Sequence, residues 1–563
     1  MLKSILKFLV FGFIFFISFE TIFAQNLTLI VHSKDSTNMA VLKKIAYIKK
    51  HPNKISALNE VDSISTIITK LGYINNTYLL TEKDSIIDCE FTLNKKIEII
   101  RVYYPENSID QKILKQLALN TSNSYFDIFF NSIENTIYQL IQYFENSGHP
   151  FTSIYLSDIS QQNDLLSAKL NLNISSKRTV DNIIIKGYPE FPEKYLKHYL
   201  NIKTNETFNI NDLTKLSELI NTIPFITQIK KPEVLFTKDS TSLYLYLTKK
   251  SNSNFDGIIG FSNEDNRSSI QFNGYLDLNL NNVLNKGESF GIHWENTQDL
   301  NSSLKLNFNS PYIFNSNFIF NGSFSIFRQD SSYVNTNGHI KLGHEINQKN
   351  LITLTGSNEK SNLSSTSNTS NNTNSFTKKM LGVSYTFNIP EKSIYNNRYK
   401  FYVDTGFLIG NRKSENSKTQ QNIFELSANY IANLNTRNSI LLKTTTQLLN
   451  TSNPFENELF RIGGINSIRG FNEQSILTSK YNITTIEYHY LTNKTSYLYT
   501  ITDLAILNNI NTQTTTQIYG VGLGYFLTTK RTILNLSYAV GSNYDTSFNI
   551  NNSKIHIKIT YPF

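Results

Sequence analysis

The second half of the chain alternates between apolar and polar residues with a period of two, and this pattern constrains the fold most strongly. From Asn252 onward, segments such as Ile270–Leu280, Leu381–Ile389 and Lys554–Phe563 place an apolar side chain at about every second position. Such alternation is typical of strands with one apolar face, which occur in soluble sandwiches and in transmembrane barrels. No stretch beyond the N-terminus approaches eighteen consecutive apolar residues, so a membrane-spanning form of this chain must cross the bilayer with strands.

The N-terminus has the features of a secretory signal. Two lysines precede the apolar segment Phe8–Phe19, and Ile22-Phe23-Ala24 ends in a small residue, so we expect cleavage before Gln25. The alternative is a membrane anchor, but the apolar run is short for a span and Glu20 closes it. We therefore assign residues 1–24 to a signal peptide.

The signal, the aromatic residues near strand ends and the terminal Phe563 together favour a transmembrane barrel over a soluble sandwich. We assign residues 251–563 to this barrel and expect about sixteen antiparallel strands in it. With this strand number, the Ser/Asn/Thr-rich stretch Asn358–Thr377 follows the seventh strand, and a loop at about Asn450–Lys480 follows the eleventh. Both loops then lie at the end of the barrel that carries its longer loops.

Composition excludes several other classes of protein. The chain has 563 residues and a net charge of +9, but only 17% of its residues are charged and they form no dense basic patch, which argues against nucleic-acid binding. The single cysteine, Cys89, allows no internal disulfide. Gly-x-Ser-x-Gly, His-Glu-x-x-His and paired-cysteine motifs are all absent, so we expect a protein that is not an enzyme and has no catalytic, cofactor-binding or metal-binding residues.

The first half of the chain contains a repeat. The helix-like segments Ala57–Leu71 and Ser132–Asn146 end at Gly72 and Gly148, and a third such segment ends near Pro224; both spacings are 76 residues. A fixed period indicates tandem copies of one structural unit. We place three α+β units at residues 25–96, 97–176 and 177–250.

Each unit is interpreted as strand, helix, helix, strand, strand, and in this order it resembles the POTRA (polypeptide-transport-associated) domain. The resemblance implies a small sheet with an exposed edge strand. Such an edge can take up an extended client by strand addition. The alternative is that the units serve only as spacers or as docking sites for a partner.

One stretch in the loop after the eleventh strand carries an unusual motif. It contains Gly463 and Gly464, which allow a tight turn, followed by Ile468, Arg469, Gly470 and Phe471. An arginine among membrane-type strands requires a partner and is by default a functional candidate.

Three POTRA-like units, a sixteen-strand barrel and this motif together resemble the BamA/TamA superfamily of outer-membrane assembly proteins. The resemblance implies that the loop folds into the lumen and that Arg469 meets acidic residues on the wall, for which Glu487 and Asp503 are the matching candidates. Arginine suits this role because its planar fork pairs with carboxylates. In this reading Gly470 gives the backbone a tight passage and Phe471 packs on the wall. The alternative is a surface-loop arginine with no fixed partner.

The same resemblance implies a weakly paired seam between the first and last barrel strands. Gly257 and Gly260 would weaken the first strand, since glycine has no side chain to pack. The last strand contributes Ile555, Ile557 and Ile559 to the seam, and Tyr561 and Phe563 to a C-terminal assembly signal.

The function implied is assembly, insertion or translocation of outer-membrane proteins without enzymatic activity. The barrel would lie in the outer membrane of a Gram-negative bacterium, in contact with its lipid, with the POTRA units in the periplasm. The partners would be unfolded outer-membrane clients and a periplasmic or inner-membrane assembly protein. Two alternatives are a two-partner secretion pore for one dedicated protein, and a porin or surface antigen. Three units favour a TamA-like or accessory role, and the lack of spare sequence for a plug helix argues against the secretion pore.

Overall fold

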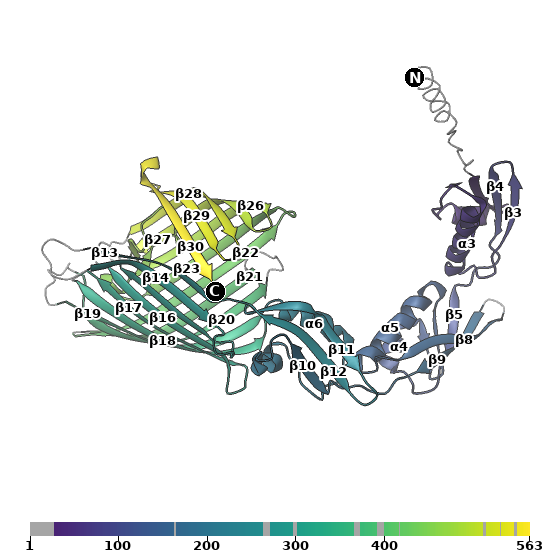
Figure 1. The fold of residues 1–563 in the computed structure, drawn as a ribbon, viewed down its shortest axis with the longest axis horizontal. Coiled ribbons are helices and arrows are strands. Elements are labelled where there is room, and N and C mark those ends of the chain that lie inside the picture. The colour runs from purple at the N-terminus through teal and green to yellow at the C-terminus, as the bar shows by residue number, and fades with distance from the viewer. Residues whose placement is uncertain are drawn as a thin grey trace, which may run out of the picture. The chain divides into compact units, whose positions relative to one another are not determined.

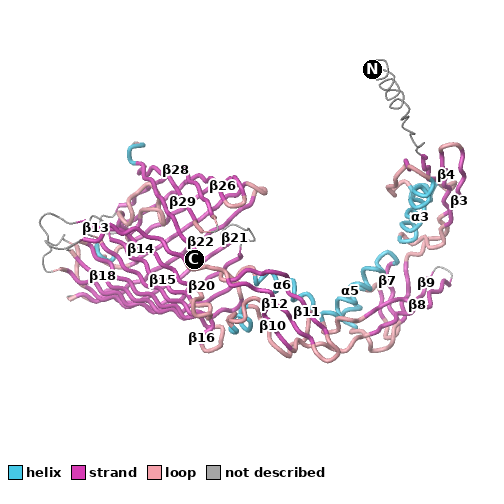
Figure 2. The backbone as a smooth tube through the Cα atoms, in the orientation of Figure 1, coloured by secondary structure: helices cyan, strands magenta, loops and turns pink. Residues whose placement is uncertain are grey.

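The computed structural model describes residues 27–162, 165–262, 271–296, 301–330, 332–364, 372–390, 399–415, 417–509, 514–529, 531–544 and 549–563. The expected signal peptide, residues 1–24, lies outside the described residues. The chain divides into two compact units. The first ends at Arg178 and also holds Thr207–Ile210, and the second holds Thr179–Glu206 and Asn211–Phe563. Figures 1 and 2 show mixed helices and strands in the N-terminal part and strands almost throughout the C-terminal part.

The first module is a four-stranded sheet with the order β2-β1-β4-β3, accompanied by two helices. Helix α3 begins after Asn53, whose side chain accepts a hydrogen bond from the Ser56 amide, as an N-cap residue does. Its buried face, which includes Val61, Ile64 and Ile68, forms the core with the sheet. The elements are β1 (Leu27–His32), α2 (Ser36–Leu42), β2 (Lys50–His51), α3 (Lys54–Lys70), β3 (Thr77–Lys83) and β4 (Ile86–Thr92).

The second module has five strands in the order β6-β7-β5-β9-β8, with Leu140 and Phe144 of helix α5 in its core. Strands β6 and β7 lie between the two helices and were not predicted, because they are short and lack a clear alternation. The elements are β5 (Ile99–Tyr103), α4 (Gln111–Leu117), β6 (Asn120–Thr121), β7 (Tyr125–Phe129), η1 (Phe130–Ser132), α5 (Ile133–Asn146), β8 (Ser153–Gln162) and β9 (Leu165–Asn173).

The third module has three strands in the order β10-β12-β11. One backbone hydrogen bond recurs in all three modules: the amides of Ile97, Arg178 and Lys250 donate to the carbonyls of Gly72, Gly148 and Phe225, at 2.8, 2.7 and 2.9 Å. The three carbonyl residues are 76 and 77 residues apart, so the predicted period reflects equivalent positions just after each long helix. The elements are β10 (Asn182–Lys186), the π-helix η2 (Tyr195–Tyr199), α6 (Ile210–Ile220), β11 (Ile226–Phe236) and β12 (Thr241–Lys249).

The barrel is closed and antiparallel, and its sixteen strands confirm the predicted number. The first eleven are β13 (Asn254–Ser262), β14 (Gln271–Asn281), β15 (Ser289–Asn296), β16 (Ser302–Ile313), β17 (Phe318–Gln329), β18 (Tyr333–Asn347), β19 (Asn350–Leu363), β20 (Phe376–Pro390), β21 (Tyr399–Ser414), β22 (Lys418–Asn433) and β23 (Asn438–Asn450). The last five are β26 (Lys480–Asn493), β27 (Ser496–Asn509), β28 (Thr514–Thr528), β29 (Ile533–Asn543) and β30 (Ser553–Pro562), with η4 (Ile550–Asn552) before β30.

Alternate side chains on the barrel strands face outward and are apolar. On β20, Leu381 and Val383 are 65% and 55% exposed, and Phe407 and Ile409 of β21 are similarly exposed, whereas Lys378 is buried. Apolar residues outside and polar residues inside are the pattern of a barrel surrounded by lipid. Separately, none of the helices in the described part of the chain is both long and apolar enough to cross a bilayer.

One predicted loop follows the seventh strand as expected but is shorter at both ends than predicted. Asn358–Thr377 was expected to follow the seventh strand, but β19 continues to Leu363 and β20 begins at Phe376. Polar residues at the end of β19 remain in the strand because they face the lumen: the Glu359 carboxylate pairs with Lys378 at 2.5 Å. The motif loop was placed correctly, since it connects β23, the eleventh strand, to β26.

Within the second unit, the third module packs on short barrel turns. The Tyr195 ring contacts the Tyr312 ring at 5.1 Å, and the Tyr188 hydroxyl donates to Asn285 Oδ1 at 2.6 Å. Gly287 has a φ of +75°, and a Cβ there would come within 2.0 Å of the Tyr195 ring. Because strand directions alternate, these turns and the β23–β26 loop lie at opposite ends of the barrel.

Candidate lumen latch and barrel seam

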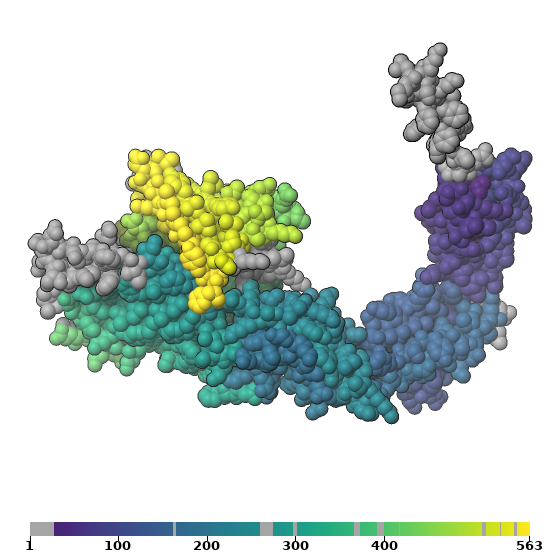
Figure 3. All heavy atoms as spheres, in the orientation of Figure 1, coloured from purple at the N-terminus to yellow at the C-terminus, as the bar shows by residue number. Residues whose placement is uncertain are grey.

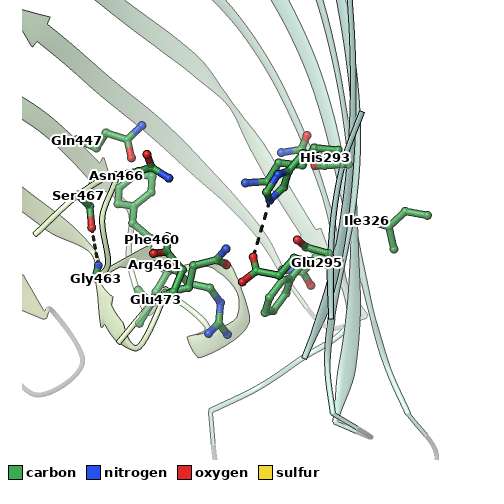
Figure 4. Close-up of a pocket in the computed structure, with 18 of the residues that line it drawn as sticks. His293, Glu295, Ile326, Gln447, Phe460, Arg461, Gly463, Asn466, Ser467 and Glu473 are labelled. Atoms are coloured by element: carbon green, nitrogen blue, oxygen red, sulfur yellow. Dashed lines mark hydrogen bonds and ion pairs between the residues drawn. The ribbon is translucent and has the colours of Figure 1, made fainter. Parts of the chain in front are cut away.

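The β23–β26 loop is structured. It contains the short helix η3 (Glu456–Glu458) and a small hairpin, β24 (Phe460–Ile462) with β25 (Ile476–Thr478). Gly463 has a φ of +118°, and a Cβ there would lie 2.2 Å from the Asn472 carbonyl oxygen. Its amide donates to Ser467 Oγ at 2.6 Å (Figure 4). Gly464, with a φ of +92°, continues the turn, so the glycine pair is needed for the backbone path itself.

Arg469 lies between Glu487 and Asp503, the two acids that the family resemblance implied as its partners. Its Nε and Nη2 donate to the two carboxylate oxygens of Asp503 at 2.8 and 2.7 Å, and its Nη1 donates to Glu487 Oε1 at 2.6 Å. The Arg469 amide adds a bond of 3.0 Å to Asp503. Asp503 is fully buried, and Arg469 and Glu487 are each 8% exposed. The arrangement is a bidentate pair with a second carboxylate, shielded from water.

Two further side chains orient the carboxylates and were not predicted. Thr485 Oγ1 donates to Asp503 Oδ1 at 2.8 Å. His489 Nε2 lies 2.7 Å from Glu487 Oε2, and its ring stacks on Tyr497 at 4.8 Å between centroids. Thr485, Glu487 and His489 are two residues apart on β26, so the period-two pattern already placed them on one face.

The motif backbone lies directly on two wall strands, where glycines provide room. A Cβ at Gly520 of β28 would come within 2.1 Å of the Arg469 carbonyl oxygen. At Gly541 of β29 it would lie 2.7 Å from the Phe471 ring, and at Gly470, where φ is +90°, it would lie 2.3 Å from the Gly541 amide. Gly520 and Gly541 were not predicted as site residues, and we call these two the glycine slot.

The other motif side chains pack beside this slot. Ile468 is fully buried in a cluster with Ile483, Ala505 and Ile518 of the wall, and Phe471 is half-buried against the same cluster. Every residue named in the motif therefore contacts either the wall or another part of the loop.

The first and last strands meet over a short length. β13 and β30 are joined by two residue pairs, Asn254–Pro562 and Phe255–Tyr561, and by the Phe563 amide, which donates to the Ser253 carbonyl at 2.8 Å. By contrast, β29 and β30 are paired continuously from Ile533–Thr560 to Val540–Ser553. Figure 3 shows the yellow last strand and the teal first strands on the same face of the barrel.

The predicted seam residues lie on these strands beyond the two pairs. Gly257 and Gly260 pair with Leu276 and Asn273 of β14, but within the described strands neither pairs with β30. On β30, Ile555 and Ile557 are 67% and 60% exposed. Ile559 is half-buried, Tyr561 is exposed and paired with Phe255, and the terminal Phe563 side chain is exposed.

A cavity of about 880 Å³ lies inside the barrel, between the loop and the first strands. Figure 4 shows the loop segment with Gly463 and Ser467 across from His293 and Glu295 on the wall. Asp256 of β13 and residues 555–558 of β30 also line the cavity, so it extends to the seam. Among the described residues, no three His, Cys, Asp or Glu side chains are grouped so that they could hold a metal ion.

Solved structures share this architecture. BamA from Haemophilus ducreyi lacking POTRA domains 1–3 is 12% identical, with a TM-score of 0.50, over 82% of this chain and 98% of that one. CdiB from Escherichia coli is 12% identical, with a TM-score of 0.51, over 89% of this chain and 98% of that one. No protein-family model and no curated protein matches the sequence.

At this level of identity, the likeness concerns the fold. α/β modules followed by a closed sixteen-strand barrel are confirmed, and with them the resemblance drawn from the sequence. The chain thus shares the fold of these BamA and CdiB structures.

Proposed function

We propose that this protein is a non-enzymatic outer-membrane factor that receives unfolded outer-membrane proteins and inserts them at the β13–β30 seam. The observation that carries the proposal is the seam itself, which two residue pairs close. Beyond Phe255 on β13 and before Tyr561 on β30, the described residues form no further pairs between the two strands. Such an edge is a template for an added strand.

The energetics favour a client strand at this position. A strand that enters hydrocarbon unpaired leaves backbone polar groups unsatisfied, and each of these costs several kcal/mol. Pairing with β13 or β30 satisfies one edge of the client before it leaves the protein. The cavity beside these strands gives the client a polar route to the seam from inside the barrel.

The modules fit an earlier step, capture of the client. Their sheets end in edge strands, for example β10 and β11 in the third module. Capture by strand addition depends on the backbone and so tolerates many client sequences. In this proposal the modules extend into the periplasm, where they also meet an assembly partner, and the barrel lies in outer-membrane lipid.

The Arg469 site has a supporting role, as a latch that holds the loop in the lumen. Its ion pair is buried, so separating Arg469 from Asp503 leaves charges without partners, which is costly. The latch stabilises the barrel wall next to a seam that must open.

A disulfide across the seam tests the proposal. Continuing the observed register would bring Ile258 opposite Lys558, so Ile258→Cys with Lys558→Cys, in a Cys89→Ala background, should join the strands where pairing is absent. We expect the oxidised form to stop inserting clients into liposomes, and reduction to restore insertion. The matched control is Ser325→Cys with Asn337→Cys, which joins β17 to β18 where the strands are already paired.

The second candidate function is a secretion pore that exports one dedicated protein through the lumen. The cavity under the loop favours it, because a charged lumen is what an exported chain would traverse. The disulfide separates the two functions: a pore remains active when the seam is closed. Normal client insertion by the oxidised protein would overturn the proposed function.

Depletion of the protein, followed by quantification of the outer-membrane proteins, then determines how many clients depend on it. A broad loss indicates a general insertase, a narrow loss an accessory factor, and loss of one secreted protein a dedicated pore.

A further inference from the structure

The β23–β26 loop has another buried attachment to the wall, eleven residues before Arg469. Glu458, at the end of η3, is 5% exposed, and Arg412 of β21 is 2% exposed. The Arg412 Nη1 pairs with Glu458 Oε1 and also donates to the Asn453 carbonyl at 3.1 Å. The guanidinium carbon lies 3.9 Å from the centre of the Phe455 ring. Arg412 therefore contacts three residues of the loop.

The Glu458 carboxylate is fully engaged. Its Oε2 accepts a hydrogen bond from Gln421 Nε2 of β22 at 3.0 Å, and its Oε1 also accepts one from the Phe455 amide at 2.9 Å. A buried carboxylate with this set of donors is held in one position.

Asn457 extends the attachment to two more wall strands and to the segment just before β20. Its Nδ2 donates to Ser361 Oγ of β19 at 2.7 Å and to the Asn374 carbonyl at 2.8 Å. Its own carbonyl accepts from Asn335 Nδ2 of β18 at 2.6 Å. Nearby, the guanidinium carbon of Arg461 lies 4.6 Å from the centre of the Phe327 ring of β17.

The two attachments use different strands. Arg469 and its neighbours contact β26, β27, β28 and β29, whereas Asn457, Glu458 and Arg461 contact β17, β18, β19, β21 and β22. Strand β23 lies between the two groups in the barrel. Between them in the chain lies the Gly463–Gly464 turn. The ion pairs of the two attachments have no side chain in common, and Phe460 packs against the apolar clusters on both sides.

We propose that Arg412 and Glu458 form a second anchor, which holds the first arm of the loop independently of Arg469. The loop is then held to the wall at two places, at Glu458 and at Arg469. The part of the loop at either anchor can detach while the other anchor stays bound. Opening the lumen completely requires release of both anchors. The second anchor does not depend on whether the client leaves through the seam or through the lumen.

Cysteine reporters distinguish two anchors from one. Leu459 follows Glu458 and is 8% exposed, and Ile468 precedes Arg469 and is fully buried. In the full-length Cys89→Ala protein, Leu459→Cys reports the second anchor and Ile468→Cys reports the first. Ser452→Cys is the positive control, because Ser452 is exposed. The measurement is the rate at which a charged maleimide labels each folded protein in micelles.

Arg412→Gln leaves the Glu458 carboxylate buried without its cation. We expect labelling at Leu459→Cys to rise about a hundredfold and labelling at Ile468→Cys to stay within about twofold, since the ion pairs of the two anchors have no side chain in common. Arg469→Gln should give the reverse. If either substitution exposes both reporters equally, the loop moves as one body and the inference is wrong. It is also wrong if Arg412→Gln leaves Leu459→Cys protected.

A double-mutant cycle tests the ion pair itself. Arg412→Gln with Glu458→Gln has no unpaired charge, so its labelling rate should lie below that of either single variant. A double variant that equals the combined single effects would show that the pair is not the anchor. If Arg412→Gln does not fold, as judged by heat-modifiable migration, Asn457→Ala takes its place. This neutral change removes the bonds to Ser361 and Asn374 and should expose Leu459→Cys alone; exposure of both reporters or of neither would overturn the inference.

Discussion

The wall formed by β26–β29 and the seam between β30 and β13 are close neighbours in the barrel, yet they differ greatly in how they are joined. The wall is paired along its strands and carries an additional buried layer, in which Arg469 joins β26 to β27 and the glycine slot receives the loop on β28 and β29. The seam has two residue pairs. The contrast teaches that the loop adds its buried contacts to strands next to the junction that has the fewest residue pairs in the described barrel.

The largest expected effect comes from removing the latch cation. Arg469→Ala leaves Asp503 and Glu487 buried without their partner, and we expect the barrel to lose about 3–5 kcal/mol of stability. Urea unfolding in detergent measures this loss. The control is Arg437→Ala in an exposed turn, which should change stability by less than about 0.5 kcal/mol. An unchanged unfolding curve for Arg469→Ala would show that the Arg469 ion pairs do not stabilise the β26–β29 wall.

Filling the glycine slot should have the next largest effect. Gly520→Ala places a Cβ 2.1 Å from the Arg469 carbonyl oxygen, so the loop must shift away from the wall. We expect a loss of about 1–3 kcal/mol, as for other overpacked sites, and faster protease cleavage in the loop. Gly338→Ala in β18 is the matched control, because a Cβ there meets no atom within 4 Å. Equal losses of stability for the two substitutions would mean that the loop backbone does not pack against Gly520.

Loss of the His489 bond should have a smaller effect. The ring is 5% exposed and contacts Glu487 Oε2, while Arg469 remains bound to both acids. We expect His489→Gln, which retains a donor, to cost about 1 kcal/mol, and His489→Ala to cost more because one carboxylate oxygen is left unsatisfied. Unfolding of the two variants side by side checks the order. The reverse order would contradict an orienting role for His489.

The smallest effect concerns Cys89. This native thiol must not be labelled if introduced cysteines are to report on the wall and on the seam. Burial raises the pKa of the Cys89 thiol from 9.0 to about 12, and the neighbouring Asp88 adds to the shift. Because the thiolate is the reactive form, labelling at neutral pH should be slow while the first module is folded.

The same shift predicts a pH dependence. The unfolded thiol ionises first, so the stability that the protonated thiol contributes is complete below pH 9 and is lost as the pH rises toward 12. Alkaline unfolding of the wild type against Cys89→Ala measures the difference. Rapid labelling of the folded protein at neutral pH would show that the module opens more readily than its packing indicates.

Much of the fold could be predicted because its strands and helices require apolar residues at regular intervals. A barrel in lipid requires apolar residues at alternate positions, and Leu381, Val383 and their neighbours supply them, so strand number and loop order followed from the sequence. The long helices of the modules were equally clear from Gly72 and Gly148. Short strands such as β6 and β7 carry too few residues for a period to be detected.

The residues of the site could be predicted where they belong to a recognisable motif, and the remaining residues of the site could not. Glu487 and Asp503 were nominated by the resemblance, and the structure brings both to Arg469. The Arg412–Glu458 pair was missed, because Glu458 lies in a loop without periodicity and its partner is 46 residues away. The glycine slot left a partial signal in the sequence: Gly520, Gly522 and Gly524 alternate on β28, and of these three the loop backbone approaches Gly520.

The central claim is that a client strand pairs at the seam, and photo-cross-linking tests it most directly. A photoreactive residue at Ile258 of β13, which is 69% exposed, should capture a client stalled during insertion. The same residue at Ile340 of β18, which is 63% exposed on a fully paired strand, should capture none. Selective cross-linking at Ile258 is the predicted result. Equal capture at both positions, or capture at neither, would contradict insertion through the seam.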